Sequence, residues 1–196
     1  REVNDATFQL MKSGHVTSAT ILTNGPFAES ACERAKDFPL CSFGVHLNVT
    51  EFRPLSQADK LRPLLDSDGR FIPDQVRRTK IDRTLSQGIF DEYSAQIDQF
   101  KEFGFSPSHL DSHNYVHTIP QIFPILKGVQ RKYNIRKVRP ARNIYADRLM
   151  GKEGLDAAIL GIGPDADSPE IGTASRVKKT IYNFMLRNYF RTKTTD

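Results

Sequence analysis

The residues best suited to chemistry are histidines gathered in one short segment. Of the five histidines in the chain, His109, His113 and His117 fall within nine positions, and Asp111 lies between the first two. On a strand, alternate side chains share one face, so His109, Asp111 and His113 would point the same way. Imidazole and carboxylate groups bind Zn²⁺, Mn²⁺ and Fe²⁺, and a carboxylate can instead orient a metal-bound imidazole. The segment therefore predicts a metal site, and the alternative is a polar loop with one structural histidine.

A second candidate ligand, His46, lies in a segment that predicts a strand with one polar face. From Phe43 to Thr50 apolar and polar residues alternate, and His46 falls in the polar set. A lone histidine of this kind is more often a hydrogen-bonded structural residue than a ligand. This one precedes a long expected loop, residues 53–73, and ligands in α/β proteins gather at the carboxyl ends of strands. Two strand ends therefore supply candidate ligands.

Strand and helix periodicities alternate along the chain, which is typical of βα units. We expect strands at residues 16–23, 43–49, 106–112 and 135–138. We expect helices near residues 3–11, 28–36, 74–86, 91–103, 119–133 and 175–190. A length of 196 residues with 38% apolar residues suits one α/β domain with a single core.

The positive charge is concentrated near the C-terminal end. The net charge is +5, and residues 174–196 contain six bases and one acid. No nucleic-acid-binding motif accompanies these bases, so we expect no nucleic-acid partner. We interpret the stretch as an amphipathic helix whose apolar stripe covers the sheet of its own chain or a second copy, which would give a homodimer. Binding to a membrane surface is the alternative.

Two further absences in the sequence bear on the compartment. No apolar run approaches the ~18 residues of a membrane span, so we expect no membrane partner. The two cysteines, Cys32 and Cys41, are too few for a disulfide framework. We expect a cytoplasmic protein.

Several short motifs follow one another in an order and spacing similar to those of a known family. They are Gly14 to Thr20 (GHVTSAT), Asn24-Gly25, Gly44 to Thr50 (GVHLNVT), Glu92-x-x-x-Gln96, and Ser108 to His113 (SHLDSH) followed by His117 and Pro120-Gln121. In these residues the chain resembles the YdjC-like carbohydrate deacetylases, the family of chitooligosaccharide deacetylase. The resemblance covers about residues 3–142.

The resemblance implies a distorted (β/α) barrel of the NodB and glycoside hydrolase-deacetylase kind, with one divalent metal ion, Mg²⁺ or Zn²⁺. The metal ligands of the family are an Asp of an A-D-D-F-G strand, the His of G-x-H-L and the first His of D-S-H, and the last two match His46 and His113. We find no counterpart of the first motif, nor of the family's later E-x-x-x-H-P-G segment after Asp147. We therefore expect residues 1–196 to be one barrel-like deacetylase domain that is truncated at both ends relative to the family.

The remaining site candidates surround the histidine motif. Where the family often has D-S-H-H-H-V-H, this chain has Asn114 and Tyr115 after His113, a neutral hydrogen-bonding group and a ring for a sugar. Arg139 and Arg142, after another expected strand, are candidates for binding sugar hydroxyls or a substrate anion, with plain surface charge as the alternative.

Hydrolysis also needs a base that accepts a proton from water and an acid that protonates the leaving amine. Asp111 is a candidate base, or it orients a metal ligand from behind. His117 is the candidate acid, and its alternatives are to cap the following helix or to bind substrate.

The sequence thus predicts a metal-dependent hydrolase that removes acetyl groups from N-acetylated amino sugars or short oligosaccharides. A bound metal would polarise the amide carbonyl and lower the pKa of water, which are the two obstacles to amide hydrolysis near pH 7. The alternatives are a catalytically inactive sugar-binding or scaffold protein and a metallophosphoesterase. The second of these needs more bridging carboxylates than Asp111 alone can provide.

Overall fold

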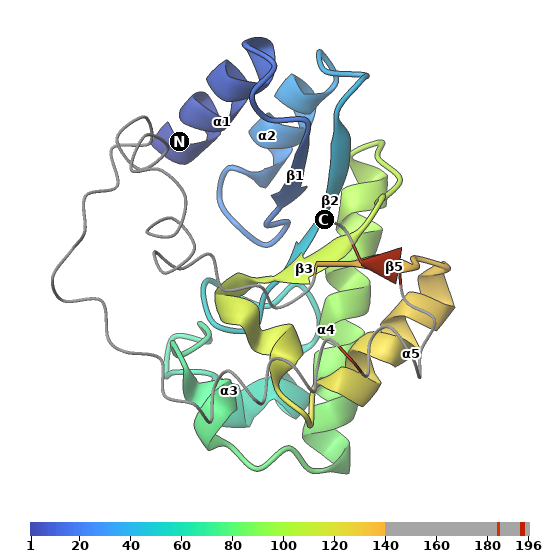
Figure 1. The fold of residues 1–196 in the computed structure, drawn as a ribbon. Coiled ribbons are helices and arrows are strands. Elements are labelled where there is room, and N and C mark those ends of the chain that lie inside the picture. Colours follow the sequence, from blue (N-terminus) through green and yellow to red (C-terminus); the bar gives the residue numbers. More distant parts are fainter. Residues whose placement is uncertain (140–183, 185–192, 195–196) are drawn as a thin grey trace, which may run out of the picture.

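The structure is a computed structural model that describes residues 1–139, 184 and 193–194 (Figure 1). Within these residues the helices are α1 (Glu2–Lys12), α2 (Ala28–Ala35), α3 (Gln75–Arg78), α4 (Arg83–Glu102) and α5 (Phe123–Tyr133), with 3₁₀ helices η1 (Ala58–Leu64) and η2 (His113–Thr118). The strands are β1 (Ser18–Ile21), β2 (Ser42–Leu47), β3 (Leu110–Ser112), β4 (Lys137–Val138) and β5 (Lys193–Thr194). None of the helices in this part of the chain has both the length and the apolar content that a membrane-spanning segment needs.

The five strands form one parallel sheet in the order β1-β2-β3-β4-β5. Each new strand is added on the same side of the one before it, whereas a doubly wound sheet reverses direction at a switch point. This sequential order is that of the wall of a (β/α) barrel. The predicted α/β fold is therefore confirmed. Because every strand runs the same way, the carboxyl ends of β1, β2 and β3 meet at one edge of the sheet.

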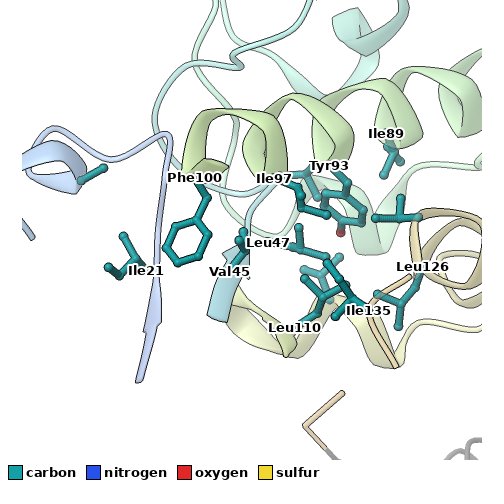
Figure 2. Packing of buried hydrophobic residues seen from close by; sticks show 14 of the residues in the cluster. Ile21, Val45, Leu47, Ile89, Tyr93, Ile97, Phe100, Leu110, Leu126 and Ile135 are labelled. Atoms are coloured by element: carbon teal, nitrogen blue, oxygen red, sulfur yellow. The ribbon is translucent and has the colours of Figure 1, made fainter. Parts of the chain in front are cut away.

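Helix α4 packs an apolar stripe behind β2 (Figure 2). Its residues Ile89, Tyr93, Ile97 and Phe100 are completely buried, and their spacing of three and four places them on one stripe. Figure 2 shows this stripe facing Val45 and Leu47 of β2 and Leu110 of β3. Full burial of such a side chain contributes about 1.5–3 kcal/mol. Tyr93, Ile97 and Phe100 belong to the helix expected near residues 91–103, and their stripe packs behind β2 (Figure 2).

The expected helices at 74–86 and 91–103 are wrong in their boundaries. The chain forms a short α3 and then one helix of 20 residues, α4, which begins after Asp82, whose side chain accepts a hydrogen bond from the amide of Leu85 at 2.8 Å. Gly88 does not interrupt the helix. A Cβ there would lie 2.8 Å from the Cβ of Lys60, so the glycine allows η1 to pack closely on α4. The expected loop at 53–73 contains η1.

The strand expected at 106–112 is shorter than predicted, because β3 comprises only Leu110–Ser112. Pro107 has no amide hydrogen to give to the ladder, and pairing with β2 starts after it. After Ser112 the chain turns into η2, so His113 is the first residue of a 3₁₀ helix and does not lie on the strand. The helix expected at 119–133 begins at Phe123, with a proline in its first turn.

Near the C-terminal end the structure adds one strand that was not expected and leaves one expected helix almost entirely outside the described residues. Strand β5 pairs in parallel with β4, and no pattern in the sequence predicted this strand. The helix expected at 175–190 lies outside the described residues except for Phe184, whose side chain is exposed. The homodimer and membrane-surface alternatives depended on that helix and stay predictions.

Replacing Gly44 by alanine should destabilise the fold. A Cβ at this position of β2 would collide with the carbonyl oxygen of His109 and lie 2.9 Å from its Nδ1. Neither atom belongs to a flexible chain end, so we expect the free energy of unfolding to fall by about 1–3 kcal/mol. Urea denaturation measures it, with Ser42→Ala, on the exposed end of the same strand, as the control. Equal stability of the two variants would contradict this packing.

Candidate functional site

The site is built on the pairing of β2 with β3. In this parallel register His46 lies opposite Asp111, one residue before each strand ends. Nδ1 of His46 is 2.5 Å from Oδ1 of Asp111 and 3.2 Å from Oγ1 of Thr20 on β1. Three adjacent strands thus fix one imidazole ring at their carboxyl ends.

Asp111 is the buried anion of this site, with only 5% of its side chain exposed. Burial alone would raise the pKa of Asp111, but the hydrogen bond to His46, together with that to the hydroxyl of Thr20, holds it below its usual value. Its second oxygen, Oδ2, faces the guanidinium of Arg139 at 3.6 Å. Because both oxygens are engaged, the arrangement favours the alternative in which Asp111 orients His46.

His113 meets His46 from the first position of η2. Nδ1 of His113 is 3.3 Å from Nε2 of His46, and the two rings are nearly perpendicular. The other nitrogen of His113, Nε2, is 3.0 Å from Oε1 of Glu51, in the loop after β2. The structure therefore brings the two predicted metal ligands together, each with a carboxylate on its far side.

The pair of imidazoles fits a shared divalent ion. Two nitrogens held ~2.0–2.1 Å from one tetrahedral ion lie ~3.3–3.4 Å apart, close to the separation of His46 and His113. A carboxylate behind a ligating histidine is the usual support of such a site, and each ring has one. Among the described residues no group of three or more His, Cys, Asp and Glu side chains is arranged to hold an ion. The described part of the chain therefore offers two candidate ligands, His46 and His113, and an ion there would need others.

His109 does not join this pair. It is buried, and its Nδ1 is 2.7 Å from Oγ of Ser108. Its ring lies over Gly44, two residues before His46 on β2. Burial lowers the pKa of His109, against the pull of the Asp111 charge. Of the three side chains expected on one face, Asp111 and His113 contact His46, and His109 has a structural position.

The predicted substrate-binding residues Asn114 and Tyr115 form an unusual turn beside the site. Both have left-handed backbone angles, with φ of 52° and 53°, which are uncommon for residues with side chains. Arg77 donates a hydrogen bond to the carbonyl oxygen of Asn114, and the Asn114 amide donates to Oγ1 of Thr50 at 3.4 Å. Strain of this kind persists only where the surroundings hold it, and it clusters at functional sites.

Tyr115 and Arg139 form the exposed rim of the site. The Tyr115 side chain is 42% exposed, and the Arg139 guanidinium lies 5.7 Å from the centre of its ring. This distance suits a cation–π contact. The last predicted substrate residue, Arg142, lies outside the described residues.

His117 lies beneath the surface of the site. It is completely buried, and Oγ of Ser112 is 2.6 Å from its Nδ1 and accepts a hydrogen bond from its backbone amide at 2.9 Å. Burial lowers the pKa of His117 to about 4, although the charge of Asp111 favours its protonated form. A buried, neutral imidazole is poorly suited to protonate a leaving amine near pH 7. The arrangement favours a structural role that was not among the expected ones: through Ser112, His117 holds the turn between β3 and α5.

Sequence reasoning missed Thr20 and Glu51. Thr20 belongs to the β1 strand that the β-branched residues predicted, so the period of two could have placed it beside His46. Glu51 lies in a loop, where no periodicity indicates the direction of a side chain.

The chain is similar to known proteins over most of its length. The profile of a family described as YdjC-like protein matches residues 1–190. A carbohydrate deacetylase of Geobacillus stearothermophilus is 35% identical over 153 residues, which cover 75% of this chain and 57% of that protein. A carbohydrate deacetylase of Halalkalibacterium halodurans is 31% identical, over 83% of this chain and 68% of that protein.

A similar solved structure is described as a "putative cellobiose-phosphate cleavage protein" from Enterococcus faecalis. It is 27% identical, with a TM-score of 0.61, and the match covers 74% of this chain and 57% of that one. The chain thus spans a little over half the length of several proteins that it matches.

His117 should stay neutral in the native protein down to about pH 5. Its pKa is lowered from 6.5 to about 4, so between these values the unfolded chain binds a proton that the folded chain does not. The stability that neutral His117 contributes is present above pH 6.5 and is lost as the pH falls toward 4. An NMR titration of the ring protons of His117 checks this. Titration of His117 near its ordinary pKa of 6.5 would contradict the burial.

Proposed function

The chain belongs to the YdjC-like protein family, and from that premise we propose that it carries the site of a metal-dependent carbohydrate deacetylase. The substrates that we propose are N-acetylated amino sugars or short oligosaccharides, and the reaction releases acetate. The names of the relatives from Geobacillus and Halalkalibacterium support the reaction class. The observation that carries the proposal is the approach of His46 and His113 to 3.3 Å at neighbouring strand ends.

In this proposal the imidazoles of His46 and His113 bind one divalent ion, Mg²⁺ or Zn²⁺. When bound, such an ion supplies a Lewis acid for the acetyl carbonyl and lowers the pKa of a water molecule. Asp111 keeps Nδ1 of His46 engaged, so that Nε2 of the same ring faces the site. Thr20 helps to fix the ring at 3.2 Å from the side of β1.

In the same proposal the rim residues Tyr115 and Arg139 bind the sugar. A sugar ring presents an apolar face for aromatic contact and hydroxyls for hydrogen bonds, and Tyr115 with Arg139 offers a partner for each. The carboxamide of Asn114 adds a neutral donor and acceptor. Asn114 and Tyr115 lie in the left-handed turn beside the site. Arg77 stabilises this turn by its hydrogen bond to the carbonyl oxygen of Asn114. We also assign Arg142 to this sugar-binding set, as the sequence predicts.

Removing either imidazole should abolish acetate release with little effect on the fold, because Thr20 and Arg139 remain as partners of buried Asp111. His46 and His113 are 23% and 27% exposed, so truncation to alanine leaves no large cavity. We expect His46→Ala and His113→Ala each to lower kcat/KM on N-acetylglucosamine oligomers by more than about 100-fold, because the ion acts on the transition state. The assay measures acetate in the presence of Zn²⁺ or Mg²⁺.

His15→Ala is the matched control, because His15 is an exposed histidine at the opposite end of β1. It should keep full activity. Undiminished turnover by His113→Ala would reject the proposal. Binding of the oligomers by the unaltered protein without any acetate release would favour the alternative of an inactive sugar-binding protein.

A further inference from the structure

We infer that Glu51 is a positioning residue that fixes the protonated nitrogen of His113 and thereby leaves Nδ1 of that ring without a proton. The inference rests on the proposed function, because it concerns how this chain prepares a ligand for a metal ion. It starts from the contact between Oε1 of Glu51 and Nε2 of His113, at 3.0 Å.

A carboxylate decides which nitrogen of a neutral imidazole carries the proton. An ionised carboxylate only accepts hydrogen bonds, so a ring nitrogen beside it must be the N–H. Glu51 therefore places the proton of His113 on Nε2. The lone pair of His113 is then on Nδ1, the atom that faces His46 at 3.3 Å.

The same reasoning applies to the partner ring from the other side. Asp111 contacts Nδ1 of His46 at 2.5 Å, which places the proton there and the lone pair on Nε2. The two carboxylates thus direct two lone pairs at each other. Lone pairs this close repel unless a proton or a cation lies between them, so the hydrogen-bond pattern itself prepares a cation site.

Glu51 is held in place by a buried polar network. Oδ1 of Asn48 accepts hydrogen bonds from the amides of Thr50 and Glu51 at 2.9 and 3.2 Å, and Nδ2 of Asn48 donates to the carbonyl oxygen of Glu51 at 2.7 Å. The side chain of Asn48 therefore hydrogen-bonds to the backbone of Glu51 at both its N–H and its C=O. Asn48 is completely buried, so water does not compete for these hydrogen bonds.

The network is anchored in helix α4. Gln96 accepts a hydrogen bond from the amide of Asn48 at 2.8 Å and donates one to its carbonyl oxygen at 2.6 Å. Glu92 accepts a second hydrogen bond from Gln96 and two from the amides of Leu55 and Ser56. The loop that carries Glu51 is thus fastened on both sides to the helix that supports β2.

Glu51 is not itself a ligand for the same ion in this arrangement. It contacts Nε2 of His113, and the nitrogen that faces His46 is on the other side of the ring. Glu51 also differs from Asp111 in exposure, because 43% of its side chain is exposed against 5%. Water weakens its hold on the ring, so we expect an effect on metal affinity at the low end of the range for such supporting residues.

The first test is the tautomer of His113 without metal. Long-range ¹H–¹⁵N NMR at one fixed pH near 7.5 distinguishes a protonated from a bare ring nitrogen. In the unaltered, metal-free chain we expect Nε2 of His113 protonated and Nδ1 bare. In Glu51→Gln, whose amide can donate as well as accept, we expect a mixture of both forms. An unchanged His113 spectrum in Glu51→Gln would overturn the inference.

The second test is the affinity for Zn²⁺ alone, by titration calorimetry. We expect Glu51→Gln to weaken binding about 10-fold. The control is Glu29→Gln on the exposed surface of α2, which removes the same charge and should bind as the unaltered chain does. Equal affinities of Glu51→Gln and the unaltered chain would overturn the inference, as would equal weakening by both variants, which would indicate general charge attraction.

The two tests separate this inference from the proposed function. If the unaltered chain and His113→Ala bind Zn²⁺ equally, the proposed metal site is wrong, and the NMR experiment still decides whether Glu51 sets the tautomer. Thermal unfolding of Glu51→Gln should match that of Glu29→Gln. A large loss of stability confined to Glu51→Gln would assign Glu51 to the fold and overturn its positioning role.

Discussion

The contact between the carboxylate of Asp111 and Nδ1 of His46 is the interaction on which the site depends. It exists because β2 and β3 pair in a parallel register that sets these two residues side by side at the carboxyl ends of their strands. An almost fully buried carboxylate is tolerated only with partners, and His46, Thr20 and Arg139 provide them. In return, the carboxylate fixes which nitrogen of His46 faces His113.

The rest of the structure keeps that contact in register. The apolar stripe of α4 packs behind β2, and Glu92 and Gln96, which lie beside this stripe on the same helix, form the polar network that fastens the next loop. One helix therefore supports both the strand that carries His46 and the loop that carries Glu51. A shift of β2 by one residue would turn His46 toward the core and separate it from Asp111, so fold and site are determined together.

Much of this arrangement could be predicted from the alternation of residues. The period of two correctly placed His46 on the polar face of β2 and Asp111 on the same side of β3, and the helix expected near residues 91–103 supports them from behind as part of α4. The boundaries of β3 were wrong because Pro107 and the turn at Asn114 act through local backbone geometry. Glu51 could not be predicted, because its direction depends on hydrogen bonds that periodicity does not reveal. The side chain of Asn48 holds the backbone of Glu51, and Asn48 is held in turn by Gln96, which is far from it in the sequence. Arg142 and most of the expected C-terminal helix lie outside the described residues.

The central claim is that His46 and His113 bind one divalent ion between them. X-ray absorption spectroscopy of the chain with one equivalent of Zn²⁺ tests it most directly, because imidazole ligands give a recognisable outer-shell pattern together with Zn–N distances of ~2.0–2.1 Å. We predict two imidazole ligands in the unaltered chain and one in His113→Ala. A zinc spectrum without imidazole scattering, or one that His113→Ala leaves unchanged, would contradict the account.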